Sequence, residues 1–146
     1  MDGFKSPTQA CNSDADVAPN CNVGDAGTTN NGMGAAIQSV DTNANFGFTK
    51  SGSGYTFESA CKSSSSRGNR YCCIAGSGAD ENGKIAYITY TMTDKGTCGD
   101  SVTLNGTEVI SMAQMIQDVC TGGPPNNNSG RLSHGCATVR VSGGHC

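Results

Sequence analysis

The residues with the clearest capacity for chemistry are two histidine–cysteine pairs near the C-terminal end, His134 with Cys136 and His145 with Cys146. Imidazole nitrogen and thiolate sulfur are good ligands for zinc and copper, so these four residues form a candidate metal site. Structural zinc sites usually carry paired C-x-x-C spacings, and none occurs in this chain. We therefore expect both cysteines to be in disulfides, both histidines to be ordinary surface residues, and neither a metal nor a cofactor to be bound.

A candidate acid–base pair is formed by Glu58 and His134. Glu58 follows the alternating segment Tyr55-Thr-Phe57, and with His134 and an arginine it could cleave RNA by general acid–base catalysis. The alternative is that Tyr55 and Phe57 fill the core while Glu58 faces water. Nine basic against twelve acidic residues also give little attraction for nucleic acid. We expect no nucleic-acid partner, and a small secreted ribonuclease is the third of our functional hypotheses.

Two pairs of carboxylates, Asp80 with Glu81 and Asp94 with Asp100, are candidates for glycoside hydrolysis. Each pair lies beside glycine in a turn-like segment, and the chain has no Trp on which a sugar ring could stack. We expect these acids to be solvent-exposed and the protein not to be an enzyme.

Three further acids, Asp14, Asp16 and Asp25, could supply oxygen ligands to calcium. No Gly or Glu follows them at the offsets of an EF-hand loop. A solvated acidic loop is the favoured interpretation.

The composition indicates a chain stabilised by disulfides. Leu, Ile, Val and Phe account for only 20 of 146 residues, and the net charge of −3 is too small for charge-driven disorder. Cysteines spread along a chain with few core residues indicate a disulfide framework formed in an oxidising compartment. Their number is odd, so one is unpaired or links two chains, and the adjacent Cys72 and Cys73 should reach different partners. The nine are Cys11, Cys21, Cys61, Cys72, Cys73, Cys98, Cys120, Cys136 and Cys146.

Other features agree with a secreted, extracellular protein. Asn105-Gly-Thr107 and Asn127-Asn-Ser129 are sequons, so Asn105 and Asn127 are candidate glycosylation sites. The residues after Met1 lack the basic and apolar regions of a signal peptide, which suggests an expression start placed before a mature domain. No apolar run approaches the roughly 18 residues of a transmembrane helix.

Apolar periodicity in the first half predicts a helix and a hairpin. Residues 1–32 show no such periodicity, and we expect an irregular arm tied down by disulfides. Helical spacing from Met33 to Val40 predicts a short helix. Residues 46–48 and 55–57 alternate around a Gly/Ser turn and predict a hairpin. Residues 63–66 are expected to form a polar loop.

The second half predicts strands around one strong helix. Strands are expected at 72–75 and 84–93, joined through 76–83, where Asn82-Gly83 is a turn signal. Further strands are expected at 101–104 and around 137–141, the latter after an exposed loop at 124–130 and a candidate bulge at Gly135.

The predicted helix begins at a capping box formed by Ser111 and Gln114. Its apolar stripe has core spacing, although such a stripe can also dock a partner. The stripe consists of Met112, Met115, Ile116 and Val119.

Together these elements predict one α+β domain over residues 33–146. Because they show no regular β-α-β rhythm, we expect a small disulfide-stapled sandwich with a mostly antiparallel sheet packed by one or two helices.

Residues 96–141 resemble a known family. Gly96-Thr-Cys98, a short strand, the helix and the returning Cys136 are similar to the core of the fungal necrosis-inducing-factor effectors, which share an α/β-sandwich with the killer toxins. The resemblance implies a fungal virulence or toxin protein that acts on a host or competitor cell, and a disulfide between Cys98 and Cys136. It transfers no functional residue.

Our first functional hypothesis is therefore a secreted, non-enzymatic effector- or toxin-like protein that binds a protein or cell-surface target. The second is a structural subunit of an extracellular coat or filament. The odd cysteine, which would allow self-association, and the small neutral surface motivate this alternative.

Overall fold

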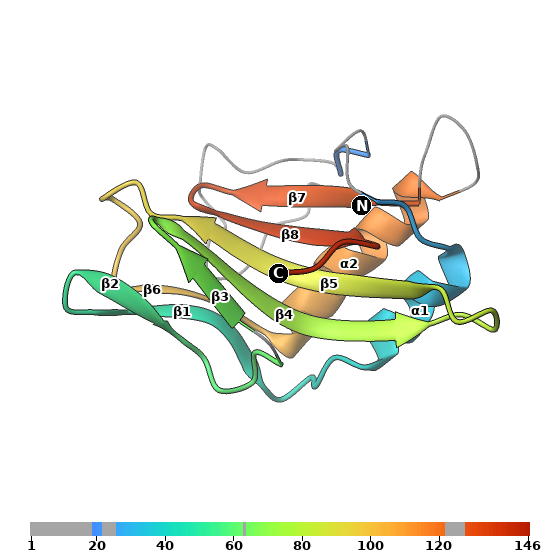
Figure 1. The fold of residues 1–146 in the computed structure, drawn as a ribbon, viewed down its shortest axis with the longest axis horizontal. Helices are drawn as coiled ribbons and strands as arrows, with labels where there is room; N and C mark the ends of the chain where they lie inside the picture. Colours follow the sequence, from blue (N-terminus) through green and yellow to red (C-terminus); the bar gives the residue numbers. More distant parts are fainter. Residues whose placement is uncertain (1–18, 22–25, 63, 122–127) are drawn as a thin grey trace.

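Two antiparallel sheets and two helices make up the fold (Figure 1). The structure, a computed structural model, describes residues 19–21, 26–62, 64–121 and 128–146. The larger sheet has five strands in the order β3-β4-β5-β8-β7. These strands are β3 (Ser64–Arg67), β4 (Arg70–Ala79), β5 (Ile85–Thr93), β8 (Ala137–Ser142) and β7 (Gly130–His134).

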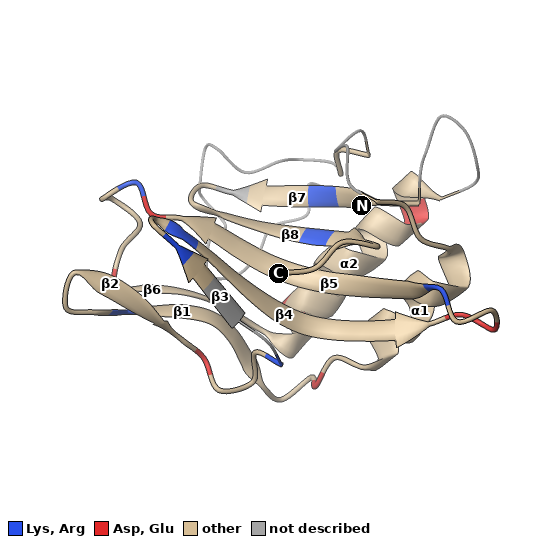
Figure 2. Cartoon of the chain, in the orientation of Figure 1, with Lys and Arg blue, Asp and Glu red and all other residues tan. Residues whose placement is uncertain are grey.

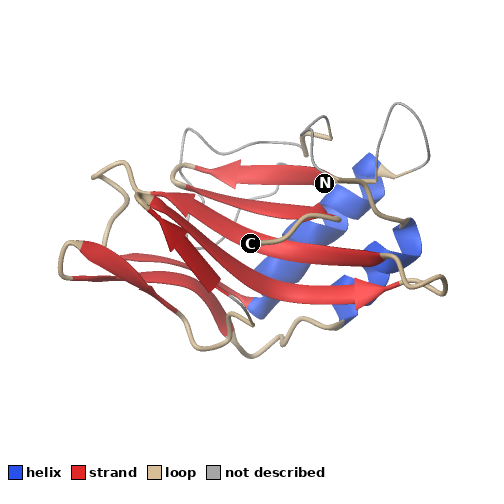
Figure 3. Cartoon of the chain, viewed as in Figure 1, coloured by secondary structure: helices blue, strands red, loops and turns tan. Residues whose placement is uncertain are grey.

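The remaining elements all pack against one face of this sheet, which we call the inner face. The second sheet has the order β2-β1-β6 and packs near β4 and β5 through β1. Both helices lie behind the large sheet in the view of Figure 3. These elements are α1 (Asn30–Gln38), β1 (Asn45–Ser51), β2 (Gly54–Phe57), β6 (Ser101–Asn105) and α2 (Gly106–Cys120). The predicted α+β class with antiparallel sheets is confirmed.

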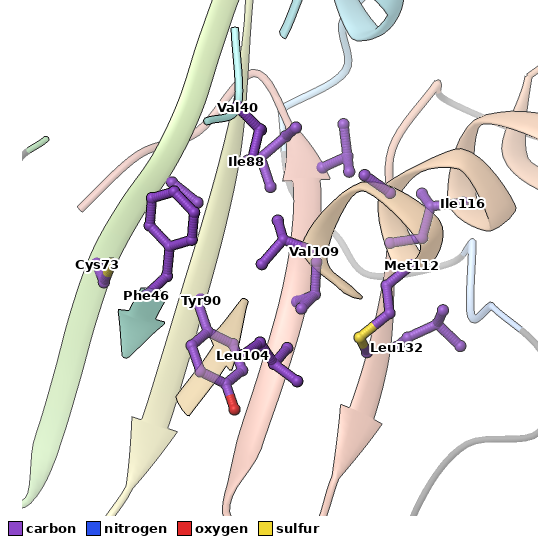
Figure 4. Close-up of a cluster of buried hydrophobic side chains, with 14 of the residues drawn as sticks. Val40, Phe46, Cys73, Ile88, Tyr90, Leu104, Val109, Met112, Ile116 and Leu132 are labelled. Atoms are coloured by element: carbon purple, nitrogen blue, oxygen red, sulfur yellow. The ribbon is translucent and has the colours of Figure 1, made fainter. Parts of the chain in front are cut away.

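The core is built on the inner side of β5, the central strand. Alternate residues of β5 point inward and are fully or almost fully buried, and Tyr90 belongs to the buried cluster (Figure 4). Its ring stacks on Phe48 of β1, with ring centroids 5.9 Å apart and an interplanar angle of 18°. The two sheets therefore meet through aromatic side chains, and α2 completes the cluster with Val109, Met112 and Ile116.

Strand β4 is longer than predicted. Residues 76–79 continue the strand and pair with residues 85–88 of β5, so only 80–84 form the turn. The glycines in this stretch are required because α1 lies directly on the strand. A Cβ on Gly76 would lie 2.8 Å from Ser39 Oγ, and a Cβ on Gly78 would overlap the backbone of Ala35 and Ala36.

Two edge strands were missed. Residues 64–67, predicted as a polar loop, form β3 and pair with β4. Residues 130–134 form β7 and pair with β8, so Gly135 lies in the turn between these strands and is not a bulge. Neither strand has an apolar alternation that the sequence could reveal, because β3 has the sequence Ser-Ser-Ser-Arg and Leu132 is the one large apolar residue of β7.

Helix α2 begins five residues before the predicted capping box. Its N-cap is Asn105, whose side chain accepts from the Glu108 N–H at 2.9 Å, while Glu108 accepts from the Asn105 N–H at 3.0 Å. The predicted stripe is correspondingly only half buried. Met112 and Ile116 have no exposed surface, whereas Val119 is 48% exposed. The buried face is instead Gly106, Glu108, Val109, Met112, Ala113, Ile116 and Cys120.

All eight cysteines in the described part of the chain are in disulfides, with Cα atoms 5.1–5.8 Å apart. Cys72 and Cys73 reach different partners, as predicted, and the pairing of Cys98 with Cys136 is the one that the resemblance implied. Cys11 lies outside the described residues. The four bonds join Cys21 to Cys120, Cys61 to Cys73, Cys72 to Cys146, and Cys98 to Cys136.

The N-terminal side of the domain is held at two places. Asn20 forms a backbone bridge with Arg131 of β7, and Cys21 is bonded to the last residue of α2. Helix α1 begins at Asn30, within the stretch that the sequence assigned to the arm, and Thr29 caps it by accepting from the Gly32 N–H at 3.0 Å.

Two glycines, one at the contact between α1 and β4 and one elsewhere on α1, should respond to alanine in opposite ways. Gly78→Ala should lower the free energy of unfolding by about 1–3 kcal/mol, because the added methyl group must displace helix backbone. Gly34→Ala should raise it by about 0.5–1 kcal/mol, because Gly34 is a helical residue with room for a methyl group. Denaturant unfolding under oxidising conditions measures both. A Gly78→Ala protein as stable as wild type would contradict this packing.

Candidate binding face

The two cysteines of the candidate metal site are not available as metal ligands. Cys136 and Cys146 are both in disulfides, so neither offers a thiolate. The His145 ring lies 4.9 Å from the Tyr87 ring, and its Nδ1 is 3.0 Å from the Cys146 carbonyl oxygen. Within the described ranges, no group of three or more His, Cys, Asp and Glu residues could hold a metal ion.

The candidate ribonuclease pair lies on two different sheets. Glu58 directly follows β2, at the edge of the small sheet, and its Oε2 is 3.4 Å from Thr49 Oγ1. His134 ends β7, at the edge of the large sheet that is opposite to β3. Tyr55, predicted as a core residue, is buried, and Phe57 is partly buried against the core.

Asp80 and Glu81 hold the β4–β5 turn against the start of α1. Asp80 Oδ1 accepts from the Asn82 and Lys84 N–H groups at 2.9 and 2.8 Å. Its Oδ2 accepts from the Thr29 hydroxyl at 2.8 Å, and Glu81 accepts from the Asn31 side chain. The hydrogen bond from Thr29, followed by those of the turn and the charge of Lys84, lowers the pKa of Asp80 from 3.8.

Asp94 and Asp100 flank the loop that follows β5. The Asp94 carboxylate accepts from the Gly96 N–H at 2.8 Å, and the Tyr55 hydroxyl donates to the Gly99 carbonyl at 2.7 Å. Burial first, and then the charges of the two aspartates, raise the pKa of Tyr55 above 10.0. These groups shape a loop that the Cys98 disulfide also ties down.

The remaining candidate sites are only partly described. Asn105 is exposed, and its Oδ1 caps α2, while N-glycosylation uses the other amide atom. Asn127 and the acidic residues Asp14, Asp16 and Asp25 lie outside the described residues. No helix in the described ranges is long and apolar enough to cross a membrane.

The sequence analysis missed a polar groove on the outer face of the large sheet. The groove has a volume of about 440 Å³. A smaller hollow of about 140 Å³ adjoins it where the C-terminal segment crosses the sheet, and Cys72, Thr91 and Arg140 line both. The side chains that line the large groove include Arg67, Arg70, Thr91, Thr93, Thr138 and Arg140.

A weak signal for this face is present in the sequence. In residues 137–142 the buried positions Ala137, Val139 and Val141 alternate with Thr138 and Arg140. A two-residue period of this kind places the polar residues on one face. The other polar residues of that face join it through strand β3 and through the pairing of β5 with β8, neither of which the sequence analysis predicted.

The charge on Asp80 predicts an acid-dependent loss of stability. Because the folded-state pKa is lowered, the stabilisation is complete above pH 3.8 and disappears as the pH falls through the folded-state value. Asp80→Asn removes the charge, so its denaturation midpoint should lie below that of wild type at neutral pH and approach it in acid. Glu81→Gln is the matched control and should show a smaller change with pH. A wild-type advantage that persists unchanged into acid would exclude this role.

Comparisons of this chain with protein-family models, with curated proteins and with solved structures gave no significant match.

Proposed function

We propose that this chain is a secreted, non-enzymatic protein of the effector or toxin type, which acts by binding a target outside the cell. The observation that carries the proposal is the set of four disulfides, which join distant parts of the chain across the fold. Such bonds form and persist in oxidising compartments, and small secreted domains use them to offset a small core. A fungal origin and a role in virulence belong to the proposal through the resemblance of residues 96–141.

The positions of the candidate acids support binding over catalysis. Asp80 and Glu81 make hydrogen bonds that hold a turn to α1, and Asp94 shapes its own loop. Glu108 is buried in the capping box of α2. A carboxylate engaged in this way is poorly placed to take up or release a proton at a substrate. The outer sheet face, in contrast, carries polar side chains that no core packing requires.

The second candidate, a structural subunit, depends on the state of one cysteine. The eight described cysteines pair within one chain, so a disulfide between chains would have to use Cys11 or exchange an existing bond. The two functions therefore differ in the state of one thiol.

Saturable binding to intact cells tests the proposed function. The fluorescently labelled, oxidised protein should bind intact plant or fungal cells and be displaced by an excess of unlabelled protein. The reduced and alkylated protein should not bind and should melt at a much lower temperature, because each native disulfide lost costs about 2–5 kcal/mol. Binding that does not saturate, or that survives reduction, would overturn the proposal, as would turnover of RNA by the native protein.

The mass of the intact, unreduced protein separates the two candidates. For a secreted binding protein we expect a monomer about 8 Da lighter than its fully reduced form, with one thiol that can be alkylated. Cys11→Ser should remove that alkylation and leave the cell binding unchanged. A doubled mass that halves on reduction and is lost in Cys11→Ser would instead support the structural subunit.

A further inference from the structure

All four arginines of this acidic chain lie on the outer face of the five-stranded sheet. Figure 2 shows them in blue on β3, β4, β7 and β8. They form two cross-strand pairs, because Arg67 is opposite Arg70 and Arg131 is opposite Arg140. No Asp or Glu occurs in any of the five described strands of this sheet. The face is therefore positively charged, although the chain carries a net charge of −3.

The first of these pairs, Arg67 with Arg70, is energetically unfavourable within the described part of the chain. Like charges directly opposite each other on paired strands destabilise a sheet. Within the described residues, no hydrogen bond or ion pair satisfies the guanidinium of Arg67 or Arg70. Asp94, which follows β5 beside this hairpin, uses its carboxylate on the Gly96 N–H. The Nε of Arg131 is buried without a hydrogen-bond partner. An anionic ligand in the groove would satisfy the donors of Arg67 and Arg70, which line it, whereas Arg131 does not line the groove.

The groove described above places three of the arginines around one hollow. Arg67, Arg70 and Arg140 line it together with the hydroxyl groups of Thr91, Thr93 and Thr138. Thr91 Oγ1 donates to the Thr138 carbonyl at 3.4 Å, and Thr138 Oγ1 is hydrogen-bonded to Ser133 Oγ at 3.0 Å, so these two hydroxyls offer a ligand their remaining acceptor positions. Arginine presents a planar fork of donors that matches carboxylate and phosphate groups, and sulfate has the same tetrahedral arrangement of oxygens as phosphate. The arginines of the lining can therefore bind anionic groups of a ligand, and the threonines can bind its neutral polar groups.

The spacing of the arginines requires a ligand with more than one charge. The Cβ atoms of directly opposite residues lie roughly 5 Å apart, so Arg67 and Arg70 can share one anionic group. Arg140 is on β8, two strands from β4, a separation of roughly 10 Å from the strand spacing alone. One small anion cannot reach both places, whereas a chain with repeated anionic groups can.

The groove lining offers a stacking surface neither to a nucleic-acid base nor to a sugar ring, so a ligand must be held by its charged groups and its hydroxyl groups. Proteins that bind single strands without sequence preference supply aromatic rings on which bases stack. Tyr71, the aromatic residue at this groove, packs its ring against Phe48, Tyr55 and Phe57. That ring is engaged in the packing between the two sheets, so it offers no stacking surface.

We propose that this groove binds an acidic glycan, a saccharide chain that carries carboxylate or sulfate groups, with Arg67 and Arg70 holding one anionic group. The proposal rests on the proposed binding function and names the chemical class of its target. The hydroxyl groups of the three threonines contact the sugar hydroxyls between the charged groups.

Binding of defined saccharides to the purified, oxidised protein tests the proposal. The probes are labelled oligogalacturonate for carboxylate and chondroitin sulfate for sulfate, with neutral dextran as the control ligand, followed by fluorescence anisotropy at low salt. At least one anionic probe should bind, dextran should not, and added salt should weaken the binding. The double variant R67Q/R70Q should bind at least about tenfold more weakly, the effect of losing charge-assisted hydrogen bonds.

A second double variant, K50Q/K84Q, is the matched control, because it removes two charges from exposed lysines outside the groove lining. It should change the affinity less than about twofold. R67Q/R70Q should show the same mass difference of about 8 Da between its oxidised and reduced forms as wild type. Its melting temperature should be no lower than that of wild type, since both arginines are exposed and their mutual repulsion is removed. Weaker binding by this variant would then be due to the loss of the two arginine contacts and not to unfolding.

Three results would overturn the glycan proposal. These are no binding of either anionic probe, an equal loss in the two double variants, and tighter binding of single-stranded RNA than of the saccharides. The cell-binding experiment is independent of all three. If R67Q/R70Q still binds cells saturably while the saccharides fail, the binding function stands and its assignment to this groove is wrong.

Discussion

Four disulfides hold together a chain that has only 20 Leu, Ile, Val and Phe residues from which to build a core. Net stabilities of folded domains are about 5–15 kcal/mol, so a few bonds worth about 2–5 kcal/mol each decide whether such a chain folds. Their positions follow from this constraint. Cys73 and Cys120 lie in the core itself, where their sulfur atoms also serve as buried apolar groups.

The same shortage of apolar residues leaves one sheet face without a packing role. Both helices and the small sheet cover the inner face, so most of the available apolar side chains are used there, and Ile85 and Val119 are the exposed large hydrophobic residues of the described ranges. The outer face can then carry arginine and threonine. Cys72, on that face, is bonded to Cys146, so the C-terminal segment is fixed across the sheet. Polar side chains on paired strands of a cross-linked sheet are positioned before a ligand arrives, which lowers the entropy lost on binding.

Burial patterns decided which parts of the structure could be predicted. The central strand β5, the β1–β2 hairpin and both helices carry a clear apolar period, because each buries one side against the core. Strands β3 and β7 are polar edge strands, and their existence depends on pairing with β4 and β8. Gly76 and Gly78 indicated a loop, yet they are strand residues because α1 contacts them. The arginine face was missed for a similar reason, since Arg67 and Arg140 are far apart in the chain and adjoin one groove only after the strands have paired.

The net charge of −3 limits how this face can recognise a target. The described acids lie in turns, loops and α2, and beyond the Debye length of about 8 Å all surface charges are largely screened, so a distant anion is not attracted to the protein. Attraction begins only at the groove, where guanidinium groups donate hydrogen bonds directly. Affinity must then come from short contacts whose geometry the strands fix, and little can come from long-range steering. A protein of this kind selects by the spacing of anionic groups on its ligand, whereas a strongly basic protein would bind any polyanion.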